Sequence, residues 1–354
     1  EGAAALASDP IPERKTRQRH TTKTYDRKSM AATVMHAGEA EVVRSPRCGK
    51  RRPEEAWGKE ESSEANGFDL RYQALRRIHS SLFGEVVLAE DGIIGKMVVV
   101  KKSSRLRAAG NEDPVSEARL LRKIEARGGH PNIIKIFDAF EDSKNVRLVM
   151  EYFPEDLFRV VQEEGNFSEA LARYYFKKIL AAVRFLHENG IAHLDLSLEN
   201  ILVGKGRLDL KLCDFGASRE VKPGEFLKNV LAGKLNYAAP EILDKKPFRP
   251  MPADIYSLGT MLFVMLTGHP LYDLETPNGR SSMRYACGGR KSMTQLLAAY
   301  GYSSDHPKCP SADAVDLIAR LMLASPVERP SLEQIESHPW MMTQKTAGAV
   351  SVER

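Results

Sequence analysis

The sequence is poor in the features that mark secreted and membrane proteins. Its four cysteines, Cys48, Cys213, Cys287 and Cys309, form no C-x-x-C pair. No apolar signal segment opens the chain, and the longest strongly apolar run, Met261 to Leu266, is far below the ~20 residues needed to cross a bilayer. We therefore expect reduced thiols, a location in the cytoplasm or the nucleus, and no membrane contact.

A large excess of charge of one sign is also missing. The 354 residues hold 52 Lys and Arg against 47 Asp and Glu, a formal net charge of +5. A balance this small for the length gives no global argument for a nucleic-acid partner, and we expect none. The length allows one large two-lobed domain or two ordinary ones, each with an ample core.

Residues 1–66 have few aromatic side chains and no sustained hydrophobic periodicity. Such a composition cannot bury enough apolar area to fold alone, so we predict a disordered, partly basic arm. Its basic clusters, residues 14–19 and 44–52, could address a nuclear import receptor or a polyanion. A solvated tail is the commoner explanation of such clusters.

The most informative stretch runs from His193 to Asn200, HLDLSLEN, and is followed by Asp214-Phe215-Gly216. Transfer of a γ-phosphoryl group needs a carboxylate that orients the attacking hydroxyl and two oxygen ligands for Mg²⁺. Asp195, Asn200 and Asp214 can supply these groups. Both strings resemble the His-Arg-Asp-x-x-x-x-Asn and Asp-Phe-Gly motifs of eukaryotic protein kinases.

This resemblance covers about residues 70 to 341. It implies an α+β, two-lobed kinase fold: a small, mainly antiparallel β N-lobe with one helix and the hinge over residues 67–153, and a larger, mainly helical C-lobe over residues 154–341. A short flexible tail, residues 342–354, would follow. The resemblance also implies ATP and Mg²⁺ as cofactors, a protein substrate with a serine or threonine acceptor, and a monomer. The strings at 130–132 and 337–340 are loosely similar to the calcium/calmodulin-dependent group.

The N-lobe motifs follow in the order of the family. Two β-branched runs, residues 83–89 and 97–101, flank Glu90-Asp91-Gly92, the pattern of a hairpin. Lys101, at the end of the second run, matches the lysine that holds the α- and β-phosphates of ATP. Glu117 matches the helix glutamate that pairs with this lysine.

The helix that carries Glu117 is predicted from its start signal, Asp113 as N-cap and Pro114 at the first helical position. Glu112 and Glu125 are rivals for the pairing role. Glu117 is preferred because the apolar residues that follow it reproduce the spacing of the family: Leu120, Leu121 and Ile124.

Several residues match positions that surround ATP in the family. Val86, Val99 and Leu202 match the adenine pocket, Met150 the gatekeeper position, and Glu151 to Phe153 the hinge. Strands are predicted at residues 130–134 and 146–152, and the second strand contains the gatekeeper position and the start of the hinge.

The weakest match is the glycine-rich loop, His79 to Gly84, which keeps only Gly84 of three glycines. Glycines let backbone N–H groups approach the phosphates, so His79 and Ser81 in their places predict a stiffer flap and a weaker grip on ATP. Asp156 matches a position that contacts the ribose or a substrate arginine.

The chain departs from the family at the activation switch. Leu194 stands where most serine/threonine kinases have the arginine that binds a phosphorylated activation-loop residue. Between Asp214 and Glu241 the only hydroxyl side chains are Ser218 and Tyr237. We therefore predict an activation segment that needs no phosphorylation.

A second departure is paired. Ser197 replaces the lysine two residues after the catalytic aspartate, and Lys234 replaces a threonine of the substrate-docking loop. Our hypothesis is that Lys234 supplies the cation that Ser197 cannot. The alternative is that Lys234 is exposed to solvent and the site is slower.

The C-lobe should rest on two long helices. One begins after Ser168, its predicted N-cap, and ends at Asn189-Gly190. The other, from Asp254 to Leu266, is apolar nearly all round and should be buried. The family match implies that Asp254 binds the catalytic-loop backbone and that Glu241 pairs with Arg329.

The sequence leaves three candidate functions. A protein serine/threonine kinase is favoured because Lys101, Glu117, Asp195, Asn200 and Asp214 are all present. A pseudokinase, a binding module that uses the same fold, is favoured by the poor glycine loop and by Ser197. A small-molecule phosphotransferase is disfavoured by the Ala239-Pro240-Glu241 segment.

Overall fold

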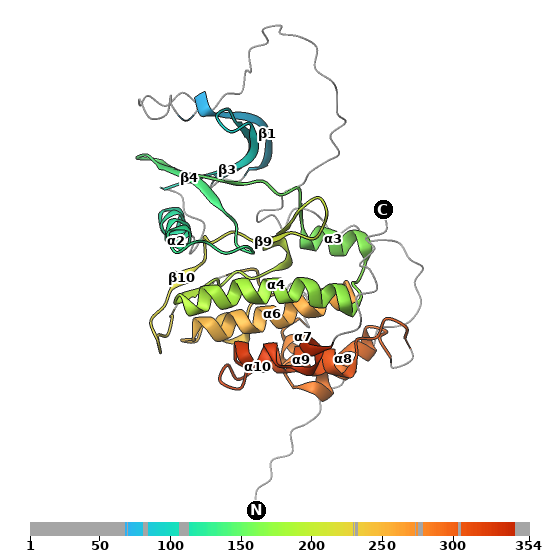
Figure 1. Ribbon diagram of the computed structural model, residues 1–354. Coiled ribbons are helices and arrows are strands. Elements are labelled where there is room, and N and C mark those ends of the chain that lie inside the picture. Colours follow the sequence, from blue (N-terminus) through green and yellow to red (C-terminus); the bar gives the residue numbers. More distant parts are fainter. Residues whose placement is uncertain are drawn as a thin grey trace, which may run out of the picture. The chain divides into compact units, whose positions relative to one another are not determined.

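The computed structural model describes the kinase-like part of the chain (Figure 1). The described residues are 68, 70–80, 84–105, 113–228, 230, 233–272, 274, 279–303 and 306–343. They all belong to one compact unit, residues 33–354. The predicted arm, residues 1–66, and residues 344–354 of the predicted tail lie outside this description. The limits of arm, lobes and tail therefore stay predictions.

The N-lobe is an antiparallel five-stranded sheet with the order β1-β2-β3-β5-β4. Its strands are β1 (Tyr72–Ser80), β2 (Gly84–Asp91), β3 (Lys96–Ser104), β4 (Ile136–Glu141) and β5 (Asn145–Glu151). The predicted hairpin is the β2–β3 pair, in which Val86 lies opposite Lys101. The helix α2 (Pro114–Ala126) packs beside the sheet, capped by the Asp113 side chain as expected.

The strand predicted at residues 130–134 is wrong, because β4 begins only at Ile136. Residues 130–132 form a turn instead, in which the backbone N–H of Asn132 donates to the His130 ring at 3.1 Å. Ile133 makes only an isolated bridge to Leu212. A proline at position 131 removes one N–H donor, which favours a turn over a ladder.

The C-lobe is mainly helical, so the expected α+β fold class is confirmed. Its helices are α3 (Leu157–Glu164), α4 (Glu169–Glu188), α5 (Pro240–Leu243), α6 (Pro250–Thr267), α7 (Gly279–Ala286), α8 (Arg290–Ala299), α9 (Ala312–Leu321), α10 (Leu332–Glu336) and α11 (Pro339–Met342). Short strands and one 3₁₀ turn line its upper side: β6 (Glu155–Asp156), β7 (Ile191–Ala192), η1 (Leu198–Asn200), β8 (Ile201–Val203), β9 (Leu210–Leu212) and β10 (Arg219–Glu220).

The helices α4 and α6 run side by side through the C-lobe (Figure 1). Ser168 caps α4 as predicted, and the helix ends at Asn189. Nearly every side chain of α6 is buried, as its apolar sequence indicates. These two helices form the base from which the catalytic loop is held. In the described part of the chain, no helix is both long and apolar enough to span a membrane.

Candidate active site

The catalytic loop, residues 193–200, is tied to α6 by one buried carboxylate. Asp254 accepts the backbone N–H of His193 at 2.9 Å and that of Leu194 at 2.8 Å, as the family resemblance implied. Its Oδ2 also lies 2.9 Å from Nε2 of His187 on α4. The loop needs this anchor because Leu194 has a φ of 64°, a left-handed conformation that costs a bulky residue ~1–3 kcal/mol.

Lys101 joins the two lobes through two carboxylates. Its Nζ donates to both oxygens of Glu117 at 2.8 and 2.9 Å, and to Oδ1 of Asp214 at 2.8 Å. Burial alone would lower the pKa of Lys101, but the charges of Asp214 and Glu117 raise it above its ordinary value. Lys101 is therefore a fixed cation in the cleft. Of the two rivals of Glu117, Glu112 lies outside the described residues, and Glu125 has no contact with Lys101 among the contacts of the described chain.

Asp214 is held ready as an anion. Burial favours its neutral form, yet the attraction of Lys101 outweighs this and lowers the pKa of the carboxyl. Its backbone φ is 63°, a second left-handed residue in the site. The N–H of the preceding Cys213 donates to the backbone oxygen of Asn200 at 2.9 Å, which brings Asn200 and Asp214 to the same part of the cleft.

Asp195 and Asn200 face each other across the catalytic loop. The Asn200 amide donates to Oδ2 of Asp195 at 2.9 Å and to its backbone oxygen at 2.7 Å. The side chain of Asp195 keeps 15% of its surface exposed, so a substrate hydroxyl can reach it. This geometry suits a carboxylate that orients an attacking hydroxyl.

Lys234 reaches into this pair. Its Nζ lies 3.3 Å from Asp195 Oδ2, 3.1 Å from Ser197 Oγ and 3.2 Å from Asn200 Oδ1. Burial opposes its charge, but Asp195 and Glu199 raise its pKa. Gly233 makes the approach possible, because a Cβ at this residue, with φ of 79°, would lie 2.5 Å from the Leu194 oxygen.

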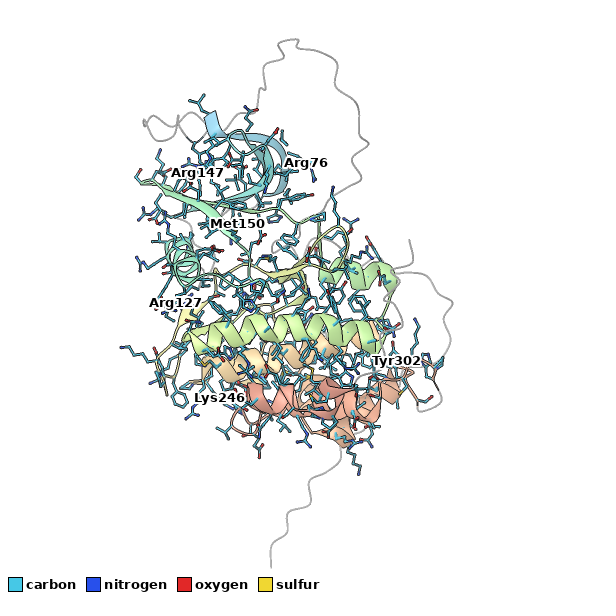
Figure 2. All side chains as sticks on the ribbon, viewed as in Figure 1. Arg76, Arg127, Arg147, Met150, Lys246 and Tyr302 are labelled. Atoms are coloured by element: carbon cyan, nitrogen blue, oxygen red, sulfur yellow. The ribbon has the colours of Figure 1, made fainter. Side chains whose placement is uncertain are left out.

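A hollow of about 380 Å³, part of it open to solvent, lies between β2, β3, β5 and β8. Its walls come from nine residues: Val86, Lys101, Glu117, Ile134, Met150, Glu151, Leu202, Cys213 and Asp214. Met150 lies on β5 (Figure 2), and it is one of the residues that line this hollow. The walls are mainly apolar with a charged end, which fits a flat base carrying phosphates.

Two wall residues were not predicted as part of this site. Ile134 lies in the segment that the sequence wrongly indicated as a strand, so its direction could not be read from alternation. Cys213 directly precedes Asp214 and is buried. Burial raises the pKa of its thiol well above the ordinary value, which favours a small apolar residue over a reactive thiol.

Other predicted nucleotide contacts lie beside the hollow rather than in its wall. Val99 is fully buried opposite Met150, and Phe153 is buried in the same core. His79 lies opposite Val86 at the end of β1. Gly84 opens β2, and a Cβ there would meet the Lys102 oxygen at 2.2 Å, so a backbone contact already requires this glycine. Ser81, the other loop position, lies outside the described residues.

Asp156 takes a structural position at the start of α3. Its Oδ1 accepts the N–H of Arg159 at 2.8 Å, while Oδ2 has no partner among the described residues. Its side chain is buried, and burial raises its pKa to about 6. It is not in the wall of the hollow, so a ribose contact stays a prediction.

The activation segment is anchored by several contacts that involve no phosphate. Ser218 Oγ donates to the His193 oxygen at 3.1 Å, and β10 pairs with β7. Glu220 forms an ion pair with Lys123 of α2. Leu194 is buried in the main core, where the usual arginine would present a charge. Ser218 and Tyr237 are 4% and 6% exposed, so neither hydroxyl is open to another enzyme.

Further along, Arg329 pairs with Glu241 as expected. The guanidinium donates to the two carboxylate oxygens at 2.6 and 2.8 Å, and also to backbone oxygens of Leu323 and Pro252. Both side chains are buried. This pair joins the end of the activation segment to the base of the C-lobe.

The donor set also fits a magnesium ion. Among the described residues no group of three or more His, Cys, Asp and Glu could hold a metal. Mg²⁺ needs fewer protein ligands, because it keeps several waters and usually binds one or two side-chain oxygens together with substrate phosphates. Asp214 offers a carboxylate oxygen in the wall of the hollow beside Lys101, and Asn200 offers an amide oxygen from the neighbouring catalytic loop.

Comparison with known proteins agrees with this geometry. The protein kinase domain model matches residues 72–341. NUAK family SNF1-like kinase 2 of Rattus norvegicus is 31% identical over 274 residues, which cover 77% of this chain and 40% of that protein. Sperm motility kinase 3A of Mus musculus is 33% identical over 280 residues, 79% of this chain and 51% of that protein.

A third relative, sucrose non-fermenting protein kinase 1 of Fusarium virguliforme, is 32% identical over 276 residues, 77% of this chain and 36% of that protein. The chain thus spans about half the length, or less, of the relatives it matches. The expected resemblance to protein kinases of the serine/threonine type, loosely of the calcium/calmodulin-dependent group, is confirmed. The chain belongs to the protein kinase family.

Proposed function

We propose that this chain transfers the γ-phosphate of ATP to a serine or threonine hydroxyl of a protein. The observation that carries the proposal is the position of Lys101, bound at once to Glu117 of the N-lobe and to Asp214 of the C-lobe. Protein kinases need this lysine–glutamate pair and the aspartate in place together. We propose a monomer in the cytoplasm or the nucleus.

Each residue has a role in this proposal. Lys101, steadied by Glu117, would hold the α- and β-phosphates, and Asn200 and Asp214 would hold Mg²⁺. When bound, Mg²⁺ neutralises charge on the phosphate oxygens. Asp195 would orient the substrate hydroxyl and accept its proton, which its exposed edge and its bond from Asn200 support.

The direct test is transfer of labelled γ-phosphate to a mixed peptide library in the presence of Mg²⁺. Wild type should label peptides, and Asp195→Asn should reduce the rate by ~10²-fold or more, because a general base contributes about that much. The labelled amino acids identify the acceptor. Labelling that is equal in wild type and Asp195→Asn would show that the phosphate comes from another enzyme.

Lys234 is proposed as the cation that stabilises charge on the transferring phosphate. Its three contacts with Asp195, Ser197 and Asn200 support a position at the reacting centre, and they oppose the alternative of a solvent-exposed lysine. Lys234→Thr should therefore lower kcat by ~10²–10³-fold, the usual cost of losing such a donor. Lys205→Thr, at an exposed lysine, is the matched control.

A rescue experiment separates this role from simple loss of folding. Ser197→Lys with Lys234→Thr moves the cation back to the catalytic loop and should restore most of the lost activity. A double variant no better than Lys234→Thr alone contradicts the idea. Thermal unfolding of all variants checks that the fold is intact.

The activation segment is proposed to be ordered without phosphorylation. The buried position of Leu194 and the contacts of Ser218 and Glu220 support this. These contacts would hold the activation segment in place of the phosphate–arginine pair that other protein kinases use. Protein made in bacteria and treated with a phosphatase should keep its full activity. A phosphate on residues 214–241 that activity requires would refute the proposal.

A pseudokinase remains the second candidate, for one specific reason. Lys234 already contacts Asn200 Oδ1, an oxygen that the magnesium proposal needs. If the lysine does not give way, ATP could bind without reacting. ATP-dependent thermal stabilisation combined with no transfer to any peptide would favour this second function.

A further inference from the structure

A cluster of exposed cations covers one side of the C-lobe below the activation segment. We call it the basic face, and its members are Lys228, Lys245, Lys246, Arg249, Arg280 and Arg284. They come from three places: the activation segment, the turn between α5 and α6, and α7. Figure 2 shows Lys246 at the lower left edge of the C-lobe helices.

Contacts between the three segments hold these cations together. Leu227 and Phe248 exchange two backbone hydrogen bonds of 2.9 and 3.0 Å, and the Arg249 guanidinium lies over the Phe226 ring at 5.4 Å. Arg280 of α7 contacts Asp244 at 3.5 Å. Arg284 lies one helical turn after Arg280, so both side chains share a face of α7.

The basic face is not neutralised from within. Asp244 is the only carboxylate in residues 226–228, 243–249 and 279–286, and it already contacts both Lys246 and Arg280. Lys228, Lys245 and Arg284 form no ion pair in the part of the chain that the structure describes. Cations without carboxylate partners leave an excess of positive charge, which would attract an anionic partner.

This face begins where the acceptor site ends. A small hollow beside Asp195 is lined by Gly233, Lys234 and Ile242, among others. The next residue after Ile242 is Leu243, whose backbone oxygen faces Arg280 Nη2 at 3.5 Å. Arg280 therefore contacts the residue that follows a wall residue of this hollow, which brings one end of the basic face to the neighbourhood of the acceptor site.

We propose that the basic face selects protein substrates with aspartate, glutamate or phosphorylated side chains near the acceptor hydroxyl. Carboxylates on such a segment would complete the ion pairs that Lys228, Lys245 and Arg284 lack. Complementary charge of this kind guides docking and excludes basic segments, which Lys246 and Arg249 would repel. This inference rests on the proposed kinase function and names its substrate class.

The test uses synthetic peptides that share one serine and differ only in its neighbours, which are aspartates, alanines or lysines. The aspartate peptide should have a kcat/KM about tenfold above the alanine peptide, mainly through KM, because a few exposed ion pairs add up to about that factor. The lysine peptide should be the poorest. The advantage should shrink as ionic strength rises above ~0.15 M, where exposed charges are screened.

A charge-reversal variant assigns the preference to this face. Lys228→Glu with Arg284→Glu should reduce the ratio between aspartate and alanine peptides to about one. The matched control, Lys177→Glu with Lys205→Glu, makes the same change of net charge at exposed residues on α4 and in the turn before β9. The control should keep the tenfold ratio.

Binding of a fluorescent aspartate peptide, measured by anisotropy, separates the two levels of the proposal. Transfer with equal rates and equal binding for all three peptides would overturn the acidic preference and leave the kinase function intact. Tight binding of the aspartate peptide that the reversal variant abolishes, without any transfer, would support the basic face and overturn the kinase function.

Discussion

Arg329 and Lys101 are both cations bound to a glutamate, but their surroundings differ. Arg329 makes five hydrogen bonds to Glu241 and to backbone oxygens, and its side chain is 1% exposed. Lys101 has only carboxylates as partners, lies in the wall of a hollow and is 15% exposed. One centre is complete within the protein, and the other can still accept a ligand.

This difference indicates what each centre is for. A buried pair with every bond satisfied contributes to holding one conformation, and losing one partner leaves an unpaired charge in the core. A cation that joins the two lobes and faces a hollow is suited to binding an anion. The following variants separate these roles.

The largest effect is expected from Arg329→Met. Glu241 would be left buried without its partner, which typically costs ~3–5 kcal/mol in the free energy of unfolding. Urea denaturation measures this directly. The control is Arg329→Met with Glu241→Leu, which removes both charges and should recover most of the loss. A single variant as stable as wild type would contradict the structural role.

Lys101→Met should show the opposite balance. Phosphate transfer should fall by ~10²–10³-fold, because a cation at the phosphates is lost. Stability should fall by less than in Arg329→Met, because burial raises the pKa of Glu117, so this carboxyl can take up a proton when the lysine is lost. Lys102→Met, on the next residue of β3, is the control for activity. A loss of stability as large as that of Arg329→Met would contradict the proposed difference between the two cations.

The smallest effect is expected at Asp156, which is buried and has one carboxylate oxygen without a partner among the described residues. Burial raises its pKa to about 6 from 3.8, so the folded state favours the protonated carboxyl. The stability from this group is present at low pH and is lost as pH rises from ~4 to ~6.

Asp156→Asn keeps a cap for α3 and removes this dependence, so it should be ~1–2 kcal/mol more stable than wild type at pH 7.5 and no more stable at pH 4. Thermal unfolding at both values measures the difference. Asp209→Asn, at an exposed carboxylate, should show no such gain.

The sequence was sufficient where local periodicity determines direction. Side chains alternate along β3, so Lys102 points away from the face on which Lys101 lies, and Glu117 is preferred because the apolar residues after it reproduce the spacing of the family. The partners of Asp254 and the Glu241–Arg329 pair followed from the family resemblance. These contacts join residues of family motifs, and the motifs can be recognised in the sequence.

The sequence was insufficient where contacts override local preference. Nothing in residues 193–195 predicts a left-handed Leu194, because the conformation is imposed by the hydrogen bonds to Asp254. The apolar pair Ile133-Ile134 resembles a strand. In the structure Ile133 makes only an isolated bridge, and the pair is not part of a strand ladder. Clusters such as the basic face join segments far apart in the sequence, so no single stretch indicates them.

The burial of Ser218 and Tyr237 has a consequence for the control of this protein in a cell. An upstream enzyme could modify neither hydroxyl without first opening the segment, and the sequence offers no third one between Asp214 and Glu241. On the proposed function, phosphorylation within this segment would therefore not serve as a ready switch of activity.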